Sequence, residues 1–298
     1  MIESALALIE SVRDYSVLFV GDVIVDEYCY VLPLGKSPKE HLIAVEYVEK
    51  EVFRGGVEAA ANHLRTFCAG VSLNVGTHAM GLVPGGVGGV RKVRMVDKLY
   101  TRKLFEVHYP EYAHSIVSSP LAAEYDAVVV TDFGHGAVTP AMIEKLTEDT
   151  PFLAVNAQTN SANVGYNLIT KYFRASYIVV DEPEARLAAG DRRGPIHGVI
   201  AKLADGRCDK MIVTLGSQGA VGWENGRMVF APSFTQKVVD TMGAGDAFFA
   251  VTAPMAKTGK IEDLLLIGNA AGALKTQIVG HRGSVTKQTL IDYLKENA

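Results

Sequence analysis

The sequence lacks the marks of several protein classes. Its three cysteines, Cys29, Cys68 and Cys208, lie far apart and form no C-x-x-C pair, so it predicts neither a disulfide framework nor a zinc ribbon. Positive charge is not in excess, because 33 acidic side chains outnumber 29 basic ones and leave a formal net charge of −4. This balance argues against nucleic acid as the main partner and favours a small-molecule substrate.

Long apolar runs and export signals are also missing. No segment approaches the stretch of about 18 apolar residues that reads as a membrane-spanning helix, and residues 1–16 carry acidic side chains within a broken apolar pattern. That start is unlike a secretory signal. We therefore expect no membrane partner, and the scattered cysteines favour a reducing, cytoplasmic location.

Two common nucleotide-binding motifs are absent as well. Gly35-Lys36-Ser37 ends like a P-loop, but Tyr30 stands where that motif needs its first glycine. No G-x-G-x-x-G sequence follows a predicted strand, which disfavours a dinucleotide fold. Several histidines share no metal-ligand spacing and are expected on the surface, namely His78, His108, His114 and His281.

What the sequence does contain is a series of short valine-rich runs, at residues 17–20, 127–130, 152–155, 177–180 and 211–213. Helical segments are predicted at residues 2–12, 140–148 and 183–189. Continuous apolar strands that alternate with helices predict an α/β fold, with a parallel sheet covered on both faces. Polar residues follow the strands at the sheet edge where ligands bind, namely Asp22, Asp132, Asn156, Asp181 and Thr214.

Two segments depart from this pattern. Residues 27–53 and 91–109 alternate between apolar and polar side chains, as half-exposed antiparallel strands do, and predict a small β appendage. Residues 81–90 contain five glycines and are predicted to be a flexible connection. The basic run Arg91-Lys92-x-Arg94 has two interpretations, a solvated strand face or a clamp for a substrate phosphate.

The most informative motif is DTMGAGD, from Asp240 to Asp246. Its pattern arises by chance at roughly 0.0004 occurrences per chain of this composition. The small residues 243–245 allow a tight turn with outward-pointing amides, and the apolar run after Asp246 predicts a buried helix that begins there. Free amides at a helix N-terminus bind anions. Asp246 either caps this helix or takes a proton from an attacking hydroxyl beside the anion site.

This motif resembles the C-terminal signature of the ribokinase-like, or PfkB, carbohydrate kinases, and the resemblance extends over nearly the whole chain. Within the family the sequence is most similar to the heptose-phosphate kinase branch, which is also found fused to a nucleotidyltransferase. Further matching segments are Gly21 to Asp26, Ser37 to Glu40, Gly55-Gly56, Thr131 to Gly136 and Asp181 to Glu184. The resemblance implies a ribokinase-like three-layer sandwich in a single domain over residues 1–298, with a β lid from about residues 27–53 and 91–113.

The family resemblance also implies ATP-dependent phosphorylation of a hydroxyl on a sugar or sugar phosphate, with Mg²⁺. Carried over by position, it makes Asp246 the catalytic base and the amides of Gly243, Ala244 and Gly245 the anion hole. The implied acceptor-binding residues are Asp26, Gly55, Gly56, Glu58, Arg94 and Asp132. The implied nucleotide-binding residues are Asp181, Thr214, Gly216, Gly219 and Asn269, with Glu184 acting near magnesium through water. Gly280 to Ser284 resembles a loop that helps to hold a monovalent cation in some members, which leaves a K⁺ site open.

Several departures from the family pattern bear on the substrate. Ala59 stands where the family has a sugar-contacting asparagine, Asp181 replaces another asparagine, and His135 replaces the lysine of the branch. The stretch from Asn74 to Arg94 is shorter than in the family, so a layer at one edge of the sheet is expected to be absent. Two alternatives therefore stay open: a ligand-binding or regulatory member without turnover, and a kinase for a nucleoside or a vitamin-like alcohol. The alternating lid strands also predict an apolar face that joins two chains in a homodimer.

Overall fold

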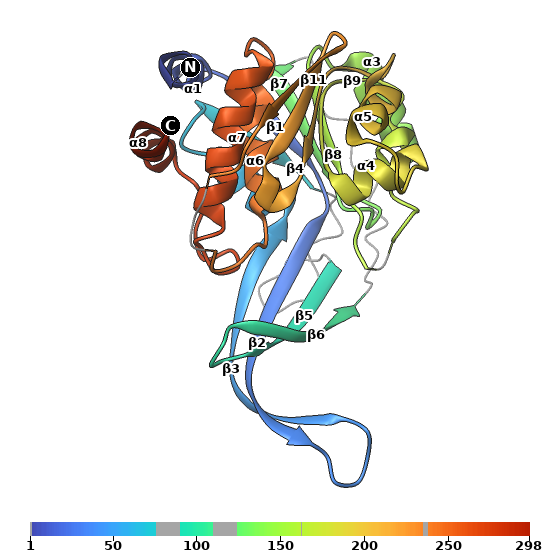
Figure 1. Ribbon diagram of the computed structural model, residues 1–298, viewed down its shortest axis with the longest axis vertical. Coiled ribbons are helices and arrows are strands. Elements are labelled where there is room, and N and C mark those ends of the chain that lie inside the picture. Colours follow the sequence, from blue (N-terminus) through green and yellow to red (C-terminus); the bar gives the residue numbers. More distant parts are fainter. Residues whose placement is uncertain (1, 76–89, 110–123, 162, 235–237) are drawn as a thin grey trace.

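The computed structural model describes residues 2–75, 90–109, 124–161, 163–234 and 238–298. These residues form a large sheet with helices on both faces and a smaller sheet that projects from one end of it (Figure 1). Some of the sequence predictions concern residues outside the described ranges. They are residues 81–89 of the predicted glycine-rich connection, most of the shortened stretch before Arg94, the lid boundary at 110–113, and His78 and His114.

The central sheet has eight strands in the order β12-β11-β10-β9-β8-β7-β1-β4. Their bounds are β1 (Ser16–Gly21), β4 (Gly70–Asn74), β7 (Ala127–Asp132), β8 (Leu153–Ala157), β9 (Ala175–Asp181), β10 (Cys208–Thr214), β11 (Ala220–Glu224) and β12 (Arg227–Ala231). Six neighbouring strands of this sheet pair in parallel, in the order β10-β9-β8-β7-β1-β4. At the other edge, β11 pairs antiparallel with both β10 and β12. The prediction of a mainly parallel sheet is confirmed.

Alternate side chains of each strand enter two separate cores. From β1, Val17 and Phe19 pack on one face, and Leu18 and Val20 pack on the other, because successive side chains of a strand point to opposite sides. The first core is covered by α1 (Ile2–Ser11), α2 (Val57–Asn62), α6 (Ala244–Met255), α7 (Ile261–Lys275) and α8 (Lys287–Asn297). The second core is covered by α3 (Pro140–Asp149), α4 (Glu182–Ala189) and α5 (Ile196–Ala204). The expected three-layer sandwich is therefore confirmed.

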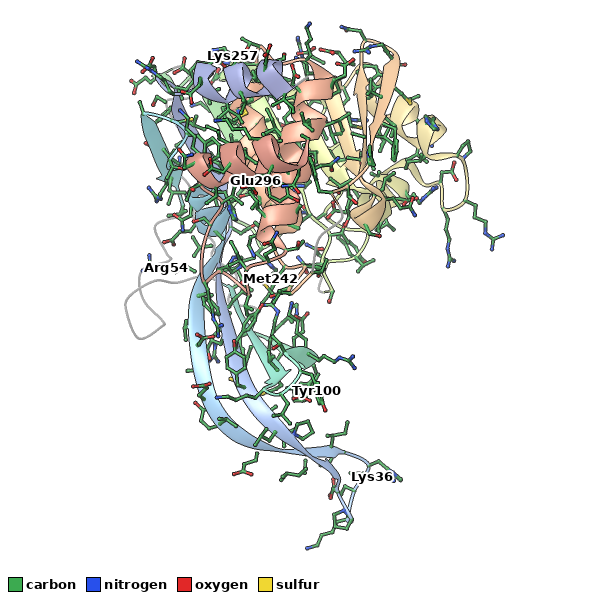
Figure 2. All side chains as sticks on the ribbon, turned by 60° about the vertical axis from the view of Figure 1, so that its left-hand side comes forward. Lys36, Arg54, Tyr100, Met242, Lys257 and Glu296 are labelled. Carbon is green, nitrogen blue, oxygen red and sulfur yellow. The ribbon has the colours of Figure 1, made fainter. Side chains whose placement is uncertain are left out.

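The second sheet has the strand order β3-β2-β5-β6. It consists of β2 (Val23–Lys36), β3 (Ile43–Gly56), β5 (Val90–Asp97) and β6 (Arg102–Tyr109). The β2–β3 hairpin reaches far beyond the rest of the molecule, and Figure 2 shows Lys36 near its outer end and Met242 at the base of the sheet. The hydroxyl of Tyr28 on β2 lies 3.1 Å from the Met242 sulfur, so one face of this sheet meets the loop before α6.

Local capping signals set several helix boundaries. Thr139 accepts a hydrogen bond from the Met142 amide at the start of α3, and α4 ends at Gly190 in a left-handed conformation with φ of 65°. The helices predicted at 2–12, 140–148 and 183–189 correspond to α1, α3 and α4. None of the helices in the described ranges is long and apolar enough to cross a membrane.

Candidate active site

The turn before α6 presents backbone amides at the end of the central sheet. Gly243 is the N-cap and has φ of 73°, a conformation that favours glycine. The helix begins at Ala244, so the amides of its first turn have no acceptor within the helix. Of the three amides predicted to form an anion hole, that of Ala244 donates to the Thr241 carbonyl oxygen at 3.3 Å. Gly245 is exposed and a Cβ there would meet no atom within 4 Å, so the turn is open at this point.

Asp246 lies in the first turn of α6, and the amide side chain of Gln158 connects it to Asn156. Its Oδ1 accepts a hydrogen bond from Nε2 of Gln158, and the same Nε2 lies 2.8 Å from Oδ1 of Asn156. Burial raises the pKa of Asp246, against the opposing effects of the Gln158 hydrogen bond and the charges of His281 and Lys275. Because Gly243 caps α6, the interpretation of Asp246 as a simple helix cap is wrong.

A pocket of about 210 Å³ opens between this turn and the ends of β8, β9 and β10. It is lined by Asn156, Gln158, Thr159, Val179, Val180, Asp181, Glu184, Thr214, Gly243, Gly245 and Asp246. The carboxyl ends of parallel strands and a helix N-terminus therefore meet around one hollow, as in other open α/β sheets. Seven residues that the sequence singled out lie together here: Asn156, Asp181, Glu184, Thr214, Gly243, Gly245 and Asp246.

Asp181 and Glu184 form a capping box at the start of α4. Oδ1 of Asp181 accepts from the Glu184 amide at 2.8 Å, and Oε2 of Glu184 accepts from the Asp181 amide at 2.9 Å. Oε1 of Glu184 accepts from the Thr159 amide at 2.8 Å. Burial, helped by the negative charges of Asp181 and Asp246, raises the pKa of Glu184 to about 7. Burial also raises the pKa of Asp181.

These carboxylates fit a hydrated divalent cation. The pocket brings Asp181, Glu184 and Asp246 together with no lysine or arginine among its described lining residues, and Mg²⁺ prefers oxygen ligands while keeping several waters. Within the described ranges, no three His, Cys, Asp or Glu side chains lie close enough to hold a metal directly. Contact through water, as the family resemblance implies for Glu184, is the arrangement that these residues fit.

Asp26 is held between the side chains of Arg94 and His281 next to this pocket. Its Oδ1 accepts from the guanidinium of Arg94, and its Oδ2 lies 3.2 Å from Nε2 of His281. Burial acts to raise the pKa of Asp26, but the contacts with His281 and Arg94 outweigh it and lower the pKa. A Cβ on Gly55 would lie 2.5 Å from Oδ2 of Asp26, so only glycine fits there. Because Asp26 contacts His281 and Tyr28 contacts Met242, motifs from both ends of the chain meet here.

Two buried aspartates organise the loop that follows β7. Asp22 accepts hydrogen bonds from three backbone amides, those of Phe133, His135 and Ala137. Asp132 accepts from the Tyr172 hydroxyl at 2.6 Å and pairs with Lys171. Burial, with a smaller effect from the charge of Asp132, raises the pKa of Asp22 to about 6. The carboxylate of Asp132, expected at the acceptor, is thus engaged by neighbouring protein groups.

Two buried bases lie beside this loop. Lys92 on β5 and His135 are both 6% exposed. Burial lowers the pKa of Lys92, opposed first by the charge of Asp26. Burial and the charge of Lys92 lower the pKa of His135 to about 4, and Nε2 of His135 is buried with no hydrogen-bond partner among the described residues. A buried nitrogen that lacks a partner is an exception that calls for a water, an ion or a ligand.

The predicted nucleotide residues occupy two neighbouring regions. Thr214 ends β10 and lines the pocket, and Gly216 begins the short helix η4 (Gly216–Gln218) directly after it. Gly219 has φ of 112°, and a Cβ there would lie 2.1 Å from the Ala231 carbonyl oxygen. These glycines therefore fix the path of the chain from β10 to β11 and its approach to β12.

Asn269 on α7 lies outside the first pocket. Its Nδ2 donates to the carbonyl oxygens of Ala231 at 3.3 Å and Pro232 at 3.1 Å. It also lines a second, largely apolar cavity of about 460 Å³, together with side chains such as Phe230 and Leu265. Apolar concave sites of this size with a few polar groups are typical of small-molecule binding.

Glu58 and Gly56, also expected at the acceptor, contact other groups of the protein. Glu58 in α2 pairs with the exposed Arg54 at 3.3 Å, and Ala59 is 5% exposed in the same helix, so it supplies no amide. A Cβ on Gly56 would lie 2.2 Å from the Asp22 carbonyl oxygen, which gives this glycine a backbone role. The Ser37 to Glu40 segment lies at the outer turn of the β2–β3 hairpin, next to Lys36 in Figure 2.

Sequence reasoning missed three residues of the site. Gln158 follows the strand-end residue Asn156 by two positions and binds Asp246, but amide side chains carry no motif. His281 was expected on the surface, which is wrong, because its side chain is 10% exposed and contacts Asp26. Lys275 is fully buried in α7. A charged residue in an otherwise apolar helical segment was the feature of the sequence that could have indicated its role.

Comparisons with known proteins identify the family of the chain. The family model described as pfkB family carbohydrate kinase matches residues 113–288, which is more than half of the chain. The chain therefore belongs to the pfkB family of carbohydrate kinases.

Individual relatives are distant. The chain is 24% identical over 301 residues to a bifunctional protein HldE of Desulfatibacillum aliphaticivorans, and the match covers 89% of this chain but 60% of that protein's length. Arabidopsis thaliana ribokinase complexed with ribose and ATP matches with a TM-score of 0.66 and 16% identity, over 95% of this chain and 99% of that one. Escherichia coli phosphofructokinase-2 in complex with potassium matches with a TM-score of 0.69 and 13% identity, over 95% and 100%.

The raised pKa of Glu184 predicts a pH-dependent stability. In the folded state this carboxyl keeps its proton up to about pH 7, whereas its ordinary pKa is 4.5, so proton binding stabilises the fold at low pH. That stabilisation is fully present below the ordinary pKa and is lost as the pH rises through the folded-state pKa. In metal-free buffer, the melting temperature of the wild type should fall between pH 5 and pH 8 more steeply than that of Glu184→Gln. Added Mg²⁺ should recover most of the difference at pH 8.

The control for this experiment is Glu182→Gln, which removes a neighbouring carboxylate that pairs with Arg186 at the surface of the same helix. Its melting profile should follow the wild type. A Glu184→Gln profile that is parallel to the wild type at every pH would show that the Glu184 carboxyl is not protonated in the folded protein near neutrality.

Proposed function

We propose that the chain transfers the γ-phosphate of ATP to a hydroxyl of a sugar phosphate, with Asp246 as the general base. The observation that carries this proposal is the meeting of Asp246, the open amide turn at residues 243–245 and the Asp181–Glu184 carboxylates around one pocket. Phosphoryl transfer requires mainly positioning and neutralisation of charge. The pocket offers a base, backbone amides and metal-binding carboxylates for these tasks. We treat the whole chain as one catalytic unit, because the acceptor group at Asp26 and the base Asp246 come from opposite ends of the sequence.

In this mechanism each protein group has a separate task. Asp246, oriented by Gln158, takes the proton of the attacking hydroxyl, and its raised pKa brings it closer to the pH at which a base works well. The amides of Gly243 and Gly245 donate hydrogen bonds to the negatively charged oxygens of the transferring group; elsewhere a single such donor contributes about 2.7 to 4 kcal/mol. Asp181 and Glu184 would hold Mg²⁺ through water, and the bound ion would neutralise phosphate charge.

The nucleotide and the acceptor approach from different sides in this proposal. Support for the nucleotide path comes from Thr214, Gly216 and Gly219, which lead from the pocket toward the second cavity beside Asn269. That cavity, lined by apolar side chains of β12 and α7, is our candidate for the adenine ring. The β2–β3–β5–β6 sheet supplies Asp26 and acts as a lid over the acceptor.

Buried positive charge favours a phosphorylated acceptor over a free sugar. Lys92 and Arg94 project from β5 beside Asp26 on β2, and His135 brings a buried nitrogen without a described partner to the same region. Arg94 already binds Asp26 and Glu106, which leaves Lys92 and His135 as the groups best placed to bind a phosphate oxygen. The missing asparagine at Ala59 fits an acceptor that is recognised more by charge than by a hydroxyl-binding amide.

The two alternatives have less support. A nucleoside or vitamin kinase would favour aromatic rings on both sides of the acceptor, but Tyr28 and Phe53 contact each other edge to face at a centroid distance of 5.4 Å. A regulatory member without turnover has no need of an oriented base, whereas Asp246 is fixed by Gln158. The HldE relative is described as bifunctional; for this chain we propose the kinase activity, in a cytoplasmic enzyme.

We further propose that two copies of the chain associate through the β2–β3 hairpin. β3 is the edge strand of its sheet, and three large apolar side chains in the outer half of the hairpin are more than half exposed, those of Leu34, Ile43 and Tyr47. An exposed edge with apolar side chains is a template for pairing with another strand. A second copy of the chain carries the same edge and the same side chains, as a symmetric dimer requires.

Replacing the base should separate catalysis from binding. Asp246→Asn keeps an oxygen that accepts the Gln158 hydrogen bond but cannot take a proton, so turnover should fall by about 10²- to 10⁴-fold. The dissociation constant of an ATP analogue, measured by calorimetry, should stay within about threefold of the wild type. Asp209→Asn, an exposed aspartate on β10, should change neither quantity. Retention of most of the activity by Asp246→Asn would exclude Asp246 as the base.

The choice of a phosphorylated acceptor can be tested at Lys92. Lys92→Met should raise the KM for a phosphorylated sugar by about 10- to 100-fold, because hydrogen bonds to charged groups contribute about 1.5 to 3 kcal/mol. Activity on the corresponding free sugar should be unchanged. Lys98→Met, at the exposed turn after β5, is the matched control. An equal loss on phosphorylated and free sugars would contradict the proposed clamp.

The dimer is tested by light scattering after gel filtration. We expect a mass of about twice the 32.0 kDa of one chain for the wild type at micromolar concentration. Tyr47→Lys together with Ile43→Lys should give the mass of one chain, since two charges would be buried in the contact. Tyr166→Lys, at an exposed tyrosine of the central body, should leave the mass unchanged. A wild type that stays monomeric up to high concentration contradicts the proposed association.

A further inference from the structure

A fully buried lysine lies directly behind the anion turn. Lys275, in the last turn of α7, has 0% exposure. Its Nζ lies 2.8 Å from the Met242 carbonyl oxygen, 2.7 Å from that of Gly280 and 3.4 Å from that of Ile278. Burying an ammonium group is costly unless it is well paired, so this arrangement calls for a specific explanation.

The three carbonyl groups come from the two loops that the lysine joins. Met242 belongs to the DTMGAGD motif, and Gly280 begins the loop that resembles a cation-binding loop of the family. Asp240 bridges the same loops, because its Oδ1 accepts from the Met242 amide at 3.1 Å and its Oδ2 accepts from the Gly280 amide at 2.9 Å. Main-chain carbonyl oxygens beside a carboxylate form the kind of oxygen-rich set that binds a hard metal cation.

The lysine side chain also supports the turn itself. A Cβ placed on Gly243 would lie 3.3 Å from Cε and 3.7 Å from Nζ of Lys275, so the end of the lysine packs beneath the residue that caps α6. The Met242 carbonyl that accepts its hydrogen bond belongs to the peptide unit that carries the Gly243 amide. The position of that amide is therefore coupled to Lys275 through a single rigid peptide plane.

We infer that Lys275 is a built-in cation: its ammonium group occupies the oxygen cage where the family resemblance left a K⁺ site open, and it fixes the anion turn without a bound monovalent ion. This inference rests on the proposed kinase function. Lys275 is a positioning residue in it, since its contacts run to Met242, Ile278 and Gly280. The consequence is a kinase whose turnover does not depend on K⁺, in place of the K⁺ requirement considered from the sequence.

A purely structural lysine is the competing explanation, and two variants of different shape distinguish it. Lys275→Ala removes the charge and empties the cage, so that K⁺ can enter. Lys275→Met removes the charge but keeps most of the side-chain volume, so that the cage stays filled. A merely structural role predicts that added K⁺ affects both variants equally, whereas a built-in cation predicts rescue of the alanine variant alone.

The experiment measures kcat against K⁺ concentration, with tetramethylammonium maintaining ionic strength. Wild-type kcat should change by less than about twofold. Lys275→Ala should lose about 10- to 1000-fold in kcat without K⁺, up to the loss caused by deleting an oxyanion-hole donor, and should recover at least about tenfold of it with saturable K⁺ dependence. Lys275→Met should show the loss without the recovery, and Lys257→Ala, at an exposed lysine, should behave as the wild type.

A readout without turnover separates this inference from the proposed function. Crystals soaked in Tl⁺, a K⁺ substitute with strong anomalous scattering, should show no ion between the Met242, Ile278 and Gly280 carbonyl groups of the wild type and one ion there in Lys275→Ala. Activation of the wild type by K⁺, or a Tl⁺ ion in its cage, overturns the inference even where both variants fail to fold. Absence of kinase activity with the predicted Tl⁺ pattern would overturn the proposed function and leave the built-in cation standing.

Discussion

Negative charge concentrated in one cleft is the constraint on which this structure depends. Asp26, Asp181, Glu184 and Asp246 lie around the end of the central sheet, and burial, together with the negative charges of Asp181 and Asp246, raises the pKa of Glu184. The protein balances some of this charge itself, because Arg94 forms an ion pair with Asp26. The Asp181–Glu184 pair has a capping box of backbone amides and no such cation in the pocket. We interpret the uncompensated negative charge of Asp181 and Glu184 as a binding site for the metal of a metal–nucleotide complex.

The fold explains why these groups meet. Parallel strands end at the same edge of the sheet, so β8, β9 and β10 deliver Asn156, Asp181 and Thr214 to one line. The helix α6 starts at this edge with a left-handed glycine that turns its amides toward the pocket. The second sheet then adds Asp26 from the beginning of the chain. In this member of the pfkB family, the fold therefore brings carboxylates from both ends of the chain to one edge of the sheet.

Much of this arrangement was predictable from the sequence because it depends on local patterns. Valine-rich runs mark strands that are buried on both faces, and the DTMGAGD motif specifies a turn by the conformational freedom of its glycines. Residues that act through distant contacts could not be predicted in this way. His281 meets Asp26 across 255 positions of the chain, and no neighbour of Lys275 in the sequence indicates that its ammonium group lies against the Met242 carbonyl.

The most direct test is a crystal structure with Mg²⁺ and a non-hydrolysable ATP analogue. The account predicts the γ-phosphate against the amides of Gly243 and Gly245, within reach of Asp246, with Mg²⁺ joined through water to Glu184. It also predicts that the carboxylate of Asp26 stays paired with Arg94 on the acceptor side. A triphosphate bound away from the turn before α6, or a metal held without Asp181 and Glu184, would contradict it.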